Sequence, residues 1–307
     1  MKLNKRGFEV SFAWLFAIIV GSVILFLAIY GTTKTIDSGN LESSAKASKQ
    51  LGILLNPLET SFESGLSVPI STSVETRIYN TCSDYAGFGK QGIQISEKSF
   101  NKWPDPLLEN TFTNKYIFSE NPTEGKNFYV FSKPFEFPFK IADLIYITSE
   151  KEKFCFVNAP EHIEEEITDL NQANLFIENC SEDSIQVCFD GSNCDIQVSY
   201  LDNYVQRYNS RVYFETDALM YGAIFADSSN YECQVQRLIA HLESLIVLYK
   251  EKDVIISSQQ CDSNLQGDLV NLYNVIQNIE DSSQLLELEN LIKTIENKNA
   301  YSSCKLW

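Results

Sequence analysis

The hydrophobic residues of this chain begin as one continuous run and only later become periodic. Val10–Thr33 contains 24 residues without a formal charge. At 1.5 Å per residue, a helix of that length reaches about 36 Å, which exceeds the roughly 30 Å hydrocarbon core of a bilayer. We therefore predict a membrane-spanning helix over residues 10–33, with the lipid bilayer as its partner.

Two further patterns follow the apolar run. Leucines recur at near-helical spacing from Leu41 to Leu58 and predict an amphipathic stalk helix over residues 34–65. Short β-branched and aromatic segments between turn-forming residues then predict a β-rich extracytoplasmic domain over residues 66–215. Within it, residues 144–148 and 154–158 flank a polar turn, which is typical of a hairpin.

The helical period returns in the C-terminal third. Ser229 and Glu232 match a capping box, and an apolar stripe follows them from Val235 to Tyr249. Residues 216–307 are therefore predicted to form a helical part packed on the β domain. The predicted fold class is α+β: one N-terminal transmembrane helix, then antiparallel strands, then helices.

The residues that flank the apolar run indicate its orientation. Lys2, Lys5 and Arg6 precede it, and the positive-inside rule places such a flank in the cytoplasm. Residues 1–9 are then a cytoplasmic basic tail or leader, and the part of the chain that follows the membrane helix is extracytoplasmic. A cleaved secretory signal is the competing interpretation, but its apolar region normally spans about 7 to 15 residues.

All eight cysteines follow the predicted membrane helix. An even number confined to the outer side is typical of a disulfide framework. One pair is suggested locally, because Cys188 and Cys194 flank a turn between two strand-like segments and would lie on opposite arms of a hairpin. The disulfide candidates are Cys82, Cys155, Cys180, Cys188, Cys194, Cys233, Cys261 and Cys304.

The excess of negative over positive charge is confined to the C-terminal half of the chain. The net charge is −17, and residues 1–160 carry 16 acidic and 16 basic residues, whereas residues 161–307 carry 25 and 8. An acidic surface repels the phosphates of nucleic acids, so we expect no nucleic-acid partner.

Known chemical motifs are absent or stand in the wrong context. Gly87–Gly92 matches G-x-G-x-x-G, yet it follows a polar turn and precedes a strand-like segment, which indicates a loop. The two histidines, His162 and His241, belong to no zinc motif. We therefore predict no catalytic, metal-binding or cofactor-binding residues, and no enzyme activity. Asn179-Cys180-Ser181 fits the N-glycosylation pattern.

The N-terminus resembles that of type IV pilins and pilin-like proteins, on the evidence of Lys5-Arg6-Gly7-Phe8 followed directly by the apolar run. In that family a peptidase cuts after the glycine, and the exposed helix packs into a filament or pseudopilus. The resemblance implies cleavage between Gly7 and Phe8, and other envelope or pilin-like subunits as partners.

The sequence thus predicts an anchored extracytoplasmic protein that serves as a structural or interaction component of the cell envelope, with a pilin-like subunit as one form of it. One alternative is a membrane-tethered module that binds a ligand or partner. Another is a tethered hydrolase, in which His162 or Cys155 would meet carboxylates in a cleft.

Overall fold

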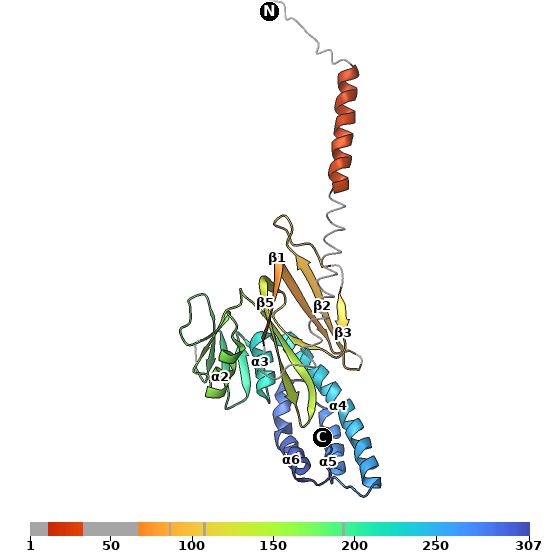
Figure 1. The fold of residues 1–307 in the computed structure, drawn as a ribbon, viewed down its shortest axis with the longest axis vertical. Coiled ribbons are helices and arrows are strands. Elements are labelled where there is room, and N and C mark those ends of the chain that lie inside the picture. Colours follow the sequence, from red (N-terminus) through yellow and green to blue (C-terminus); the bar gives the residue numbers. More distant parts are fainter. Residues whose placement is uncertain (1–11, 33–66, 86, 107–108, 192–193) are drawn as a thin grey trace, which may run out of the picture.

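The computed structural model describes residues 12–32, 67–85, 87–106, 109–191 and 194–307. The expected basic leader, the cleavage position at Gly7 and Phe8, and the amphipathic stalk at 34–65 lie outside these residues. The described part is α+β, which confirms the predicted class (Figure 1).

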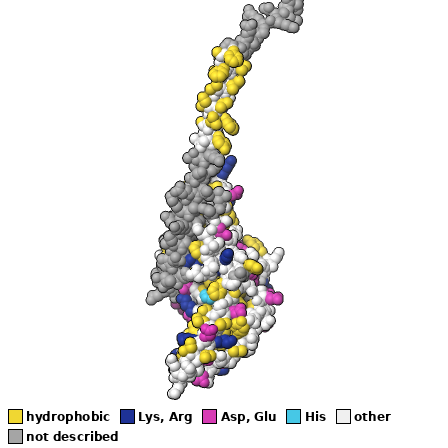
Figure 2. All heavy atoms as spheres, turned by 90° about the vertical axis from the view of Figure 1, so that its right-hand side faces the viewer, with side chains coloured by type: hydrophobic (Ala, Val, Ile, Leu, Met, Phe, Trp, Pro, Cys, Tyr) yellow, Lys and Arg dark blue, Asp and Glu magenta, His cyan; other side chains and the backbone are white. Residues whose placement is uncertain are grey.

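One described helix, Phe12–Thr32, is long and apolar enough to cross a membrane. None of its apolar window is buried against the rest of the chain. Figure 2 shows hydrophobic side chains along this helix, in contrast to the mixed surface of the domain. Its length and position near the N-terminus fit a membrane anchor or a signal sequence.

The first sheet has six strands in the order β3-β2-β1-β5-β6-β4. Its neighbouring strands are antiparallel except β4 and β6, which are parallel. The strands are β1 (Ser67–Ser83), β2 (Lys90–Glu97), β3 (Asn110–Phe112), β4 (Tyr116–Phe118), β5 (Thr123–Glu136) and β6 (Lys140–Ser149).

The second sheet corrects the prediction of purely antiparallel strands. Its order is β12-β11-β10-β9-β7-β8, and the four strands from β10 to β8 pair in parallel. Helix α2 connects β7 to β8, as parallel neighbours require a crossover. The strands are β7 (Phe154–Val157), β8 (Leu175–Ile177), β9 (Ile185–Phe189), β10 (Ile196–Ser199), β11 (Tyr204–Arg207) and β12 (Ser210–Tyr213).

Two predicted hairpins are therefore wrong. Residues 144–148 belong to β6 and residues 154–157 to β7, and these strands lie in different sheets. Cys188 and Cys194 are at disulfide distance, but the strands that they flank, β9 and β10, run parallel. In the first case the turn leads the chain from one sheet into the other, and in the second the two strands pair with each other but in parallel, so neither forms a hairpin.

The helices join the two sheets and extend beyond them (Figure 1). Helix α3 contacts strands of both sheets, and all of its residues from Ala218 to Phe225 are buried. The Phe225 ring lies 5.8 Å from Phe131 of the first sheet and 4.9 Å from Phe154 of the second. The helices are α2 (Glu161–Leu170), α3 (Asp217–Phe225), α4 (Ser228–Ser258), α5 (Gln266–Ile276), the 3-10 helix η1 (Ser282–Leu288) and α6 (Glu289–Tyr301).

The long helix α4 begins two positions earlier than the expected capping box, which has Ser229 as its N-cap. Asp227 is its N-cap, and its carboxylate accepts hydrogen bonds from the backbone N–H groups of Ser229 and Asn230. Glu232 instead accepts hydrogen bonds from Ser282 at the start of η1. The first turn of α4 therefore has a charged cap and a tertiary contact in place of a local box.

All eight cysteines are paired at disulfide distance: Cys82 with Cys233, Cys155 with Cys180, Cys188 with Cys194, and Cys261 with Cys304. The first pair joins strand β1 to helix α4 across 151 residues of sequence. The last closes the helical C-terminal part. The pairs thus tie the first sheet to α4, and they link segments within the second sheet and within the helical region.

Candidate functional site

The two residues considered for a hydrolase have separate partners in the structure. Cys155 is bonded to Cys180, so it offers no free thiol. His162 lies on α2, with its Nε2 atom 3.1 Å from the Tyr200 hydroxyl and 3.5 Å from Asp217 Oδ2. His162 therefore contacts the carboxylate of Asp217, but Cys155 cannot act as a nucleophile because its sulfur is part of a disulfide.

The second histidine lies on α4, far along the sequence from the first. Nδ1 of His241 is 3.0 Å from the Tyr116 hydroxyl, and its ring packs 4.6 Å from that of Phe88. Burial, together with the charge of Arg237, lowers the pKa of His241. Among the described residues, no group of three or more His, Cys, Asp or Glu is arranged to hold a metal ion.

The G-x-G-x-x-G segment is a structural turn between β1 and β2. Gly87 and Gly89 have φ angles of 60° and 63°, in the left-handed region that favours glycine. A Cβ on Gly89 would lie 2.1 Å from the carbonyl oxygen of Ser83. These glycines allow a close turn and form no phosphate loop, as the sequence context predicts.

A group of adjoining cavities surrounds the first turn of α4. The first cavity has a volume of about 340 Å³. The second, of about 320 Å³, lies between α4, strand β1 and the residues that follow β4. Both contain Asp227, and we call the two together the α4 N-terminal site. A third cavity, of about 280 Å³, shares Arg207 and Tyr208 with the first.

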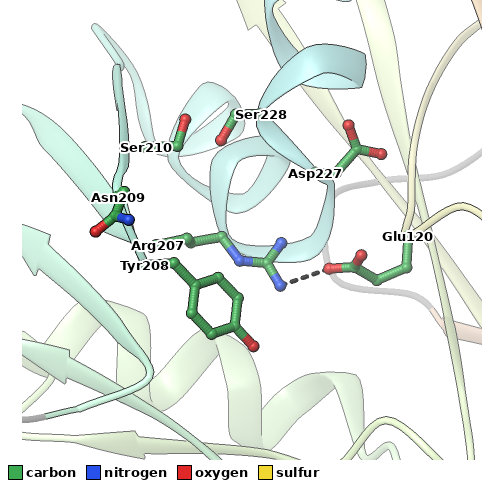
Figure 3. Close-up of a pocket in the computed structure, with 7 residues that line it drawn as sticks. All are labelled: Glu120, Arg207, Tyr208, Asn209, Ser210, Asp227 and Ser228. Atoms are coloured by element: carbon green, nitrogen blue, oxygen red, sulfur yellow. Dashed lines mark ion pairs between the residues drawn. The ribbon is translucent and has the colours of Figure 1, made fainter.

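Figure 3 shows the first cavity and the ion pair on its floor. Nη2 of Arg207 lies 2.5 Å from Glu120 Oε1, and Nη1 donates a hydrogen bond of 2.6 Å to the carbonyl of Ala226. The guanidinium thus already has a carboxylate partner. Burial, reinforced by the charge of Glu120 and opposed by Arg207, raises the pKa of nearby Glu152 to about 8.

Asp227 brings a negative charge to the wall between the two cavities. Its Oδ1 atom accepts hydrogen bonds of 3.0 and 2.9 Å from the backbone N–H groups of Ser229 and Asn230. The N–H groups that would attract an anion at a helix N-terminus are therefore already bound to a carboxylate.

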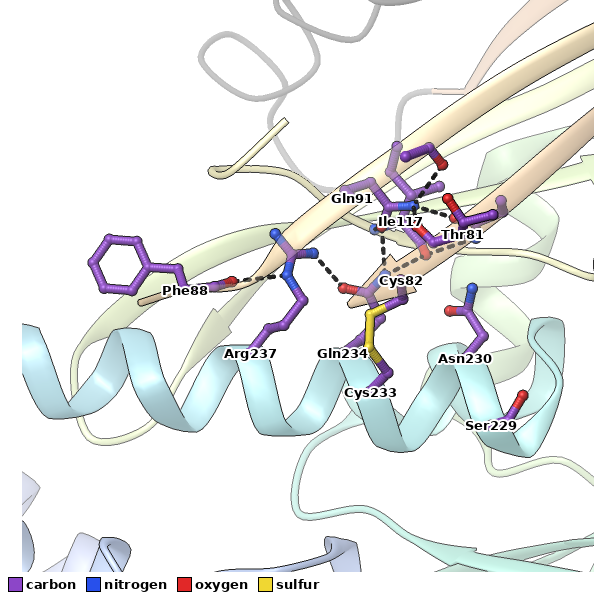
Figure 4. The surroundings of a disulfide bond; sticks show 12 residues. Thr81, Cys82, Phe88, Gln91, Ile117, Ser229, Asn230, Cys233, Gln234 and Arg237 are labelled. Carbon is purple, nitrogen blue, oxygen red and sulfur yellow. Dashed lines mark hydrogen bonds between the residues drawn. A yellow bond between two sulfur atoms is a disulfide. The ribbon is translucent and has the colours of Figure 1, made fainter. Parts of the chain in front are cut away.

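Asn230 is the unusual residue of the second cavity. It is 5% exposed, yet neither Oδ1 nor Nδ2 of its side chain has a hydrogen-bond partner among the described residues. Figure 4 shows the side chain extending from α4 toward β1, beside the Cys82–Cys233 disulfide. A buried amide without partners costs about 1 to 3 kcal/mol, so native proteins seldom retain one without a reason.

Sequence reasoning did not find this site. One signal was available: Asn230 lies four and eight residues before Gln234 and Leu238, so the helical period places its amide on the inward face of α4. The cavity itself could not be found in this way, because its other walls come from segments more than 100 residues earlier in the chain.

No protein-family model, curated protein or solved structure matches this chain.

Proposed function

We propose that the chain is a single-pass membrane protein whose N-terminus faces the cytoplasm and whose α+β domain lies outside the cell membrane. There it acts as a structural or interaction component of the cell envelope. The observation that carries this proposal is the distribution of the disulfides. All eight cysteines follow the apolar helix, and all are paired.

Redox chemistry supports this orientation independently of the flanking charges. Disulfides persist in oxidising compartments and are rare in the reducing cytosol. Four pairs in one domain would be unstable there, whereas they strengthen a domain exposed outside the cell. The basic N-terminal flank favours the same topology.

Labelling of two single-cysteine substitution variants in intact cells tests this topology. Phe100→Cys places a thiol on a side chain that is 83% exposed, and Lys2→Cys places one before the apolar run. We expect a membrane-impermeant maleimide to label Phe100→Cys in intact cells and Lys2→Cys only after lysis. Labelling in the reverse order would overturn the proposed orientation, and recovery in the soluble fraction would overturn the anchor.

The mature N-terminus distinguishes two forms of the proposal. Mass spectrometry that finds Phe8 as the first residue supports assembly as a pilin-like subunit, and an intact Met1 supports a simple anchor. A first residue after Thr33 would show that the helix is removed as a signal sequence, which contradicts membrane attachment by this segment.

A second candidate function is a membrane-tethered module that binds a ligand. The observation that favours it is the unpartnered Asn230 amide, which lines a cavity of about 320 Å³. A few fixed polar groups that converge on a concave surface are typical of ligand sites.

A further inference from the structure

We infer that the α4 N-terminal site binds a neutral ligand rich in hydroxyl groups, namely a sugar unit of a saccharide. The inference rests on the ligand-binding function proposed above and specifies its ligand class. It is carried by Asn230 and Asp227 in the second cavity, with Tyr208 at the edge of the first.

The charges around the site disfavour anions. The Arg207 guanidinium is neutralised by Glu120, and Asp227 occupies the helix N-terminus. The third cavity adds the carboxylates Glu182 and Asp195 to the same surface, together with Asp183, which is paired with Lys153. A phosphate, sulfate or carboxylate ligand would meet more negative charge than positive charge.

Cations and apolar ligands fit the second cavity poorly. Asp227 is its one carboxylate-bearing residue, whereas calcium sites use six to eight oxygen ligands that commonly include several carboxylates. The remaining lining residues are amides, hydroxyl-bearing residues and the disulfide: Asn80, Thr81, Cys82, Asn121, Ser229, Asn230 and Cys233. Asn80, Asn121 and Ser229 already form hydrogen bonds within the protein, so the Asn230 amide is the group of this wall that requires a partner that both donates and accepts hydrogen bonds.

Hydroxyl groups meet that requirement. The Asn230 amide offers donors at Nδ2 and an acceptor at Oδ1, and both are free. The Asp227 carboxylate accepts only. Neighbouring hydroxyls of a sugar ring each donate and accept, so one can donate to Oδ1 while the next accepts from Nδ2 or donates to the carboxylate. Binding would thereby give the buried amide the partners that the fold does not supply.

Tyr208 provides a surface for the apolar face of the same ligand. It lies between β11 and β12 with a φ of 50°, and it is 86% exposed. Its side chain contributes to the first and third cavities (Figure 3). A tyrosine presents a rigid apolar ring at little entropic cost, and the C–H face of a sugar packs on such rings.

Saturation-transfer NMR with the full-length protein tests the inference. The chain is held in lauryldimethylamine oxide, a detergent without a sugar headgroup, and probed with D-glucose, D-galactose, D-mannose and N-acetyl-D-glucosamine. We expect at least one sugar to receive saturation and to bind in the millimolar range or tighter. Failure of all four at saturating millimolar concentrations would overturn the inference, as would binding of triglycine without binding of any sugar.

Two variants assign the signal to the site. Asn230→Leu removes both free polar atoms at similar volume, and Tyr208→Ala removes the exposed ring. Each should weaken binding by about tenfold or more, which corresponds to the loss of one or two good contacts. Tyr301→Ala, at a residue 89% exposed in α6, is the matched control and should bind normally. Unchanged binding by Asn230→Leu would overturn the assignment.

The sugar experiment and the topology experiment fail independently. Purified protein reports on binding whatever its orientation in the cell. Conversely, the maleimide labelling pattern does not depend on any ligand. A protein with the expected topology that binds no sugar retains the proposed function as an envelope component and loses only the saccharide assignment.

Discussion

Two buried polar residues on one face of α4 have opposite surroundings. Arg237 is fully buried and Asn230 is 5% exposed, and the two are separated by seven residues, or about two helical turns. Both face the first sheet (Figure 4). The charged residue has a partner for each of its buried donor groups, whereas the neutral one has none.

The partners of Arg237 come from α4 itself and from two loops of the first sheet, one between β1 and β2 and one between β3 and β4. Its guanidinium donates hydrogen bonds of 2.7 to 3.1 Å to the side chain of Gln234 and to the backbone carbonyls of Phe88, Thr113 and Lys115. It also lies 4.6 Å from the centre of the Tyr116 ring. Burial lowers the pKa of Arg237 to about 10, which leaves it charged at neutral pH.

This difference separates a structural polar group from a candidate functional one. Arg237 satisfies carbonyls that would otherwise be buried without donors, and so it fixes α4 on the sheet. Asn230 contributes no such bond, so its burial weakens the fold unless something outside the described residues binds it. Replacing Arg237 should therefore lower the free energy of unfolding, whereas replacing Asn230 should not.

The largest effect is expected at Arg237. Arg237→Leu removes donors from three buried carbonyls and should lower the free energy of unfolding by about 4 kcal/mol. Chemical unfolding followed by circular dichroism measures the change. Arg211→Leu, at an exposed arginine with a cation–π contact to Tyr204 and a hydrogen bond to Gln206, is the control and should lower stability by about 1 kcal/mol or less. A small loss of stability in Arg237→Leu would contradict the structural role assigned to Arg237.

The Cys82–Cys233 disulfide, whose Cys233 lies between Asn230 and Arg237 on α4, should have the next largest effect on stability. Cys82→Ser combined with Cys233→Ser opens a loop of 151 residues and should cost about 3 kcal/mol. The corresponding double variant at Cys188 and Cys194, which closes a separation of only 6 residues, should cost less. Equal losses would show that loop length does not govern these bonds.

Glu152 extends the comparison to a buried acid. Its folded pKa of about 8 lies above the ordinary value of 4.5, so the folded state binds the proton more tightly than the unfolded state. Stability should therefore fall as the pH rises from about 4.5 to 8.

Glu152→Gln should remove the part of this decline that Glu152 causes and stabilise the protein at pH 8 by up to about 2 kcal/mol relative to the wild type, while Glu215, whose pKa burial raises to about 7, keeps its own part. Thermal unfolding at pH 5 and pH 8 measures both effects. Glu165→Gln, at an exposed residue of α2, should leave the pH dependence as it is. A wild-type protein more stable at pH 8 than Glu152→Gln would contradict the sign.

The smallest change is expected at Asn230. Asn230→Leu should leave the free energy of unfolding unchanged or raise it by about 1 kcal/mol, because the variant no longer buries an unpartnered amide. Unfolding in detergent without ligand provides the measurement. A loss of 2 kcal/mol or more would show that the amide has a structural partner, and would remove the basis for a ligand at this position.

Prediction from the sequence was most successful where a property belongs to one segment. The apolar helix appears at Phe12–Thr32 within the expected 10–33, and the helical stripe after Ser229 corresponds to α4. Strand directions were predicted less well. The second sheet is largely parallel. Strand direction depends on where the chain re-enters the sheet after a connection such as α2, and the alternation of polar and apolar residues along a single strand does not contain that information.

The sequence by itself determined the membrane-length apolar segment, the confinement of the cysteines to one side of it, and the α+β class. These follow from local hydrophobicity, period and order along the chain. Only the tertiary structure decided how the six cysteines other than Cys188 and Cys194 pair, how the strands run, and that Asn230 lacks partners while Arg237 has them. Hydrogen-bond satisfaction is a property of the surroundings, and for α4 those surroundings come from strands and loops more than 100 residues away.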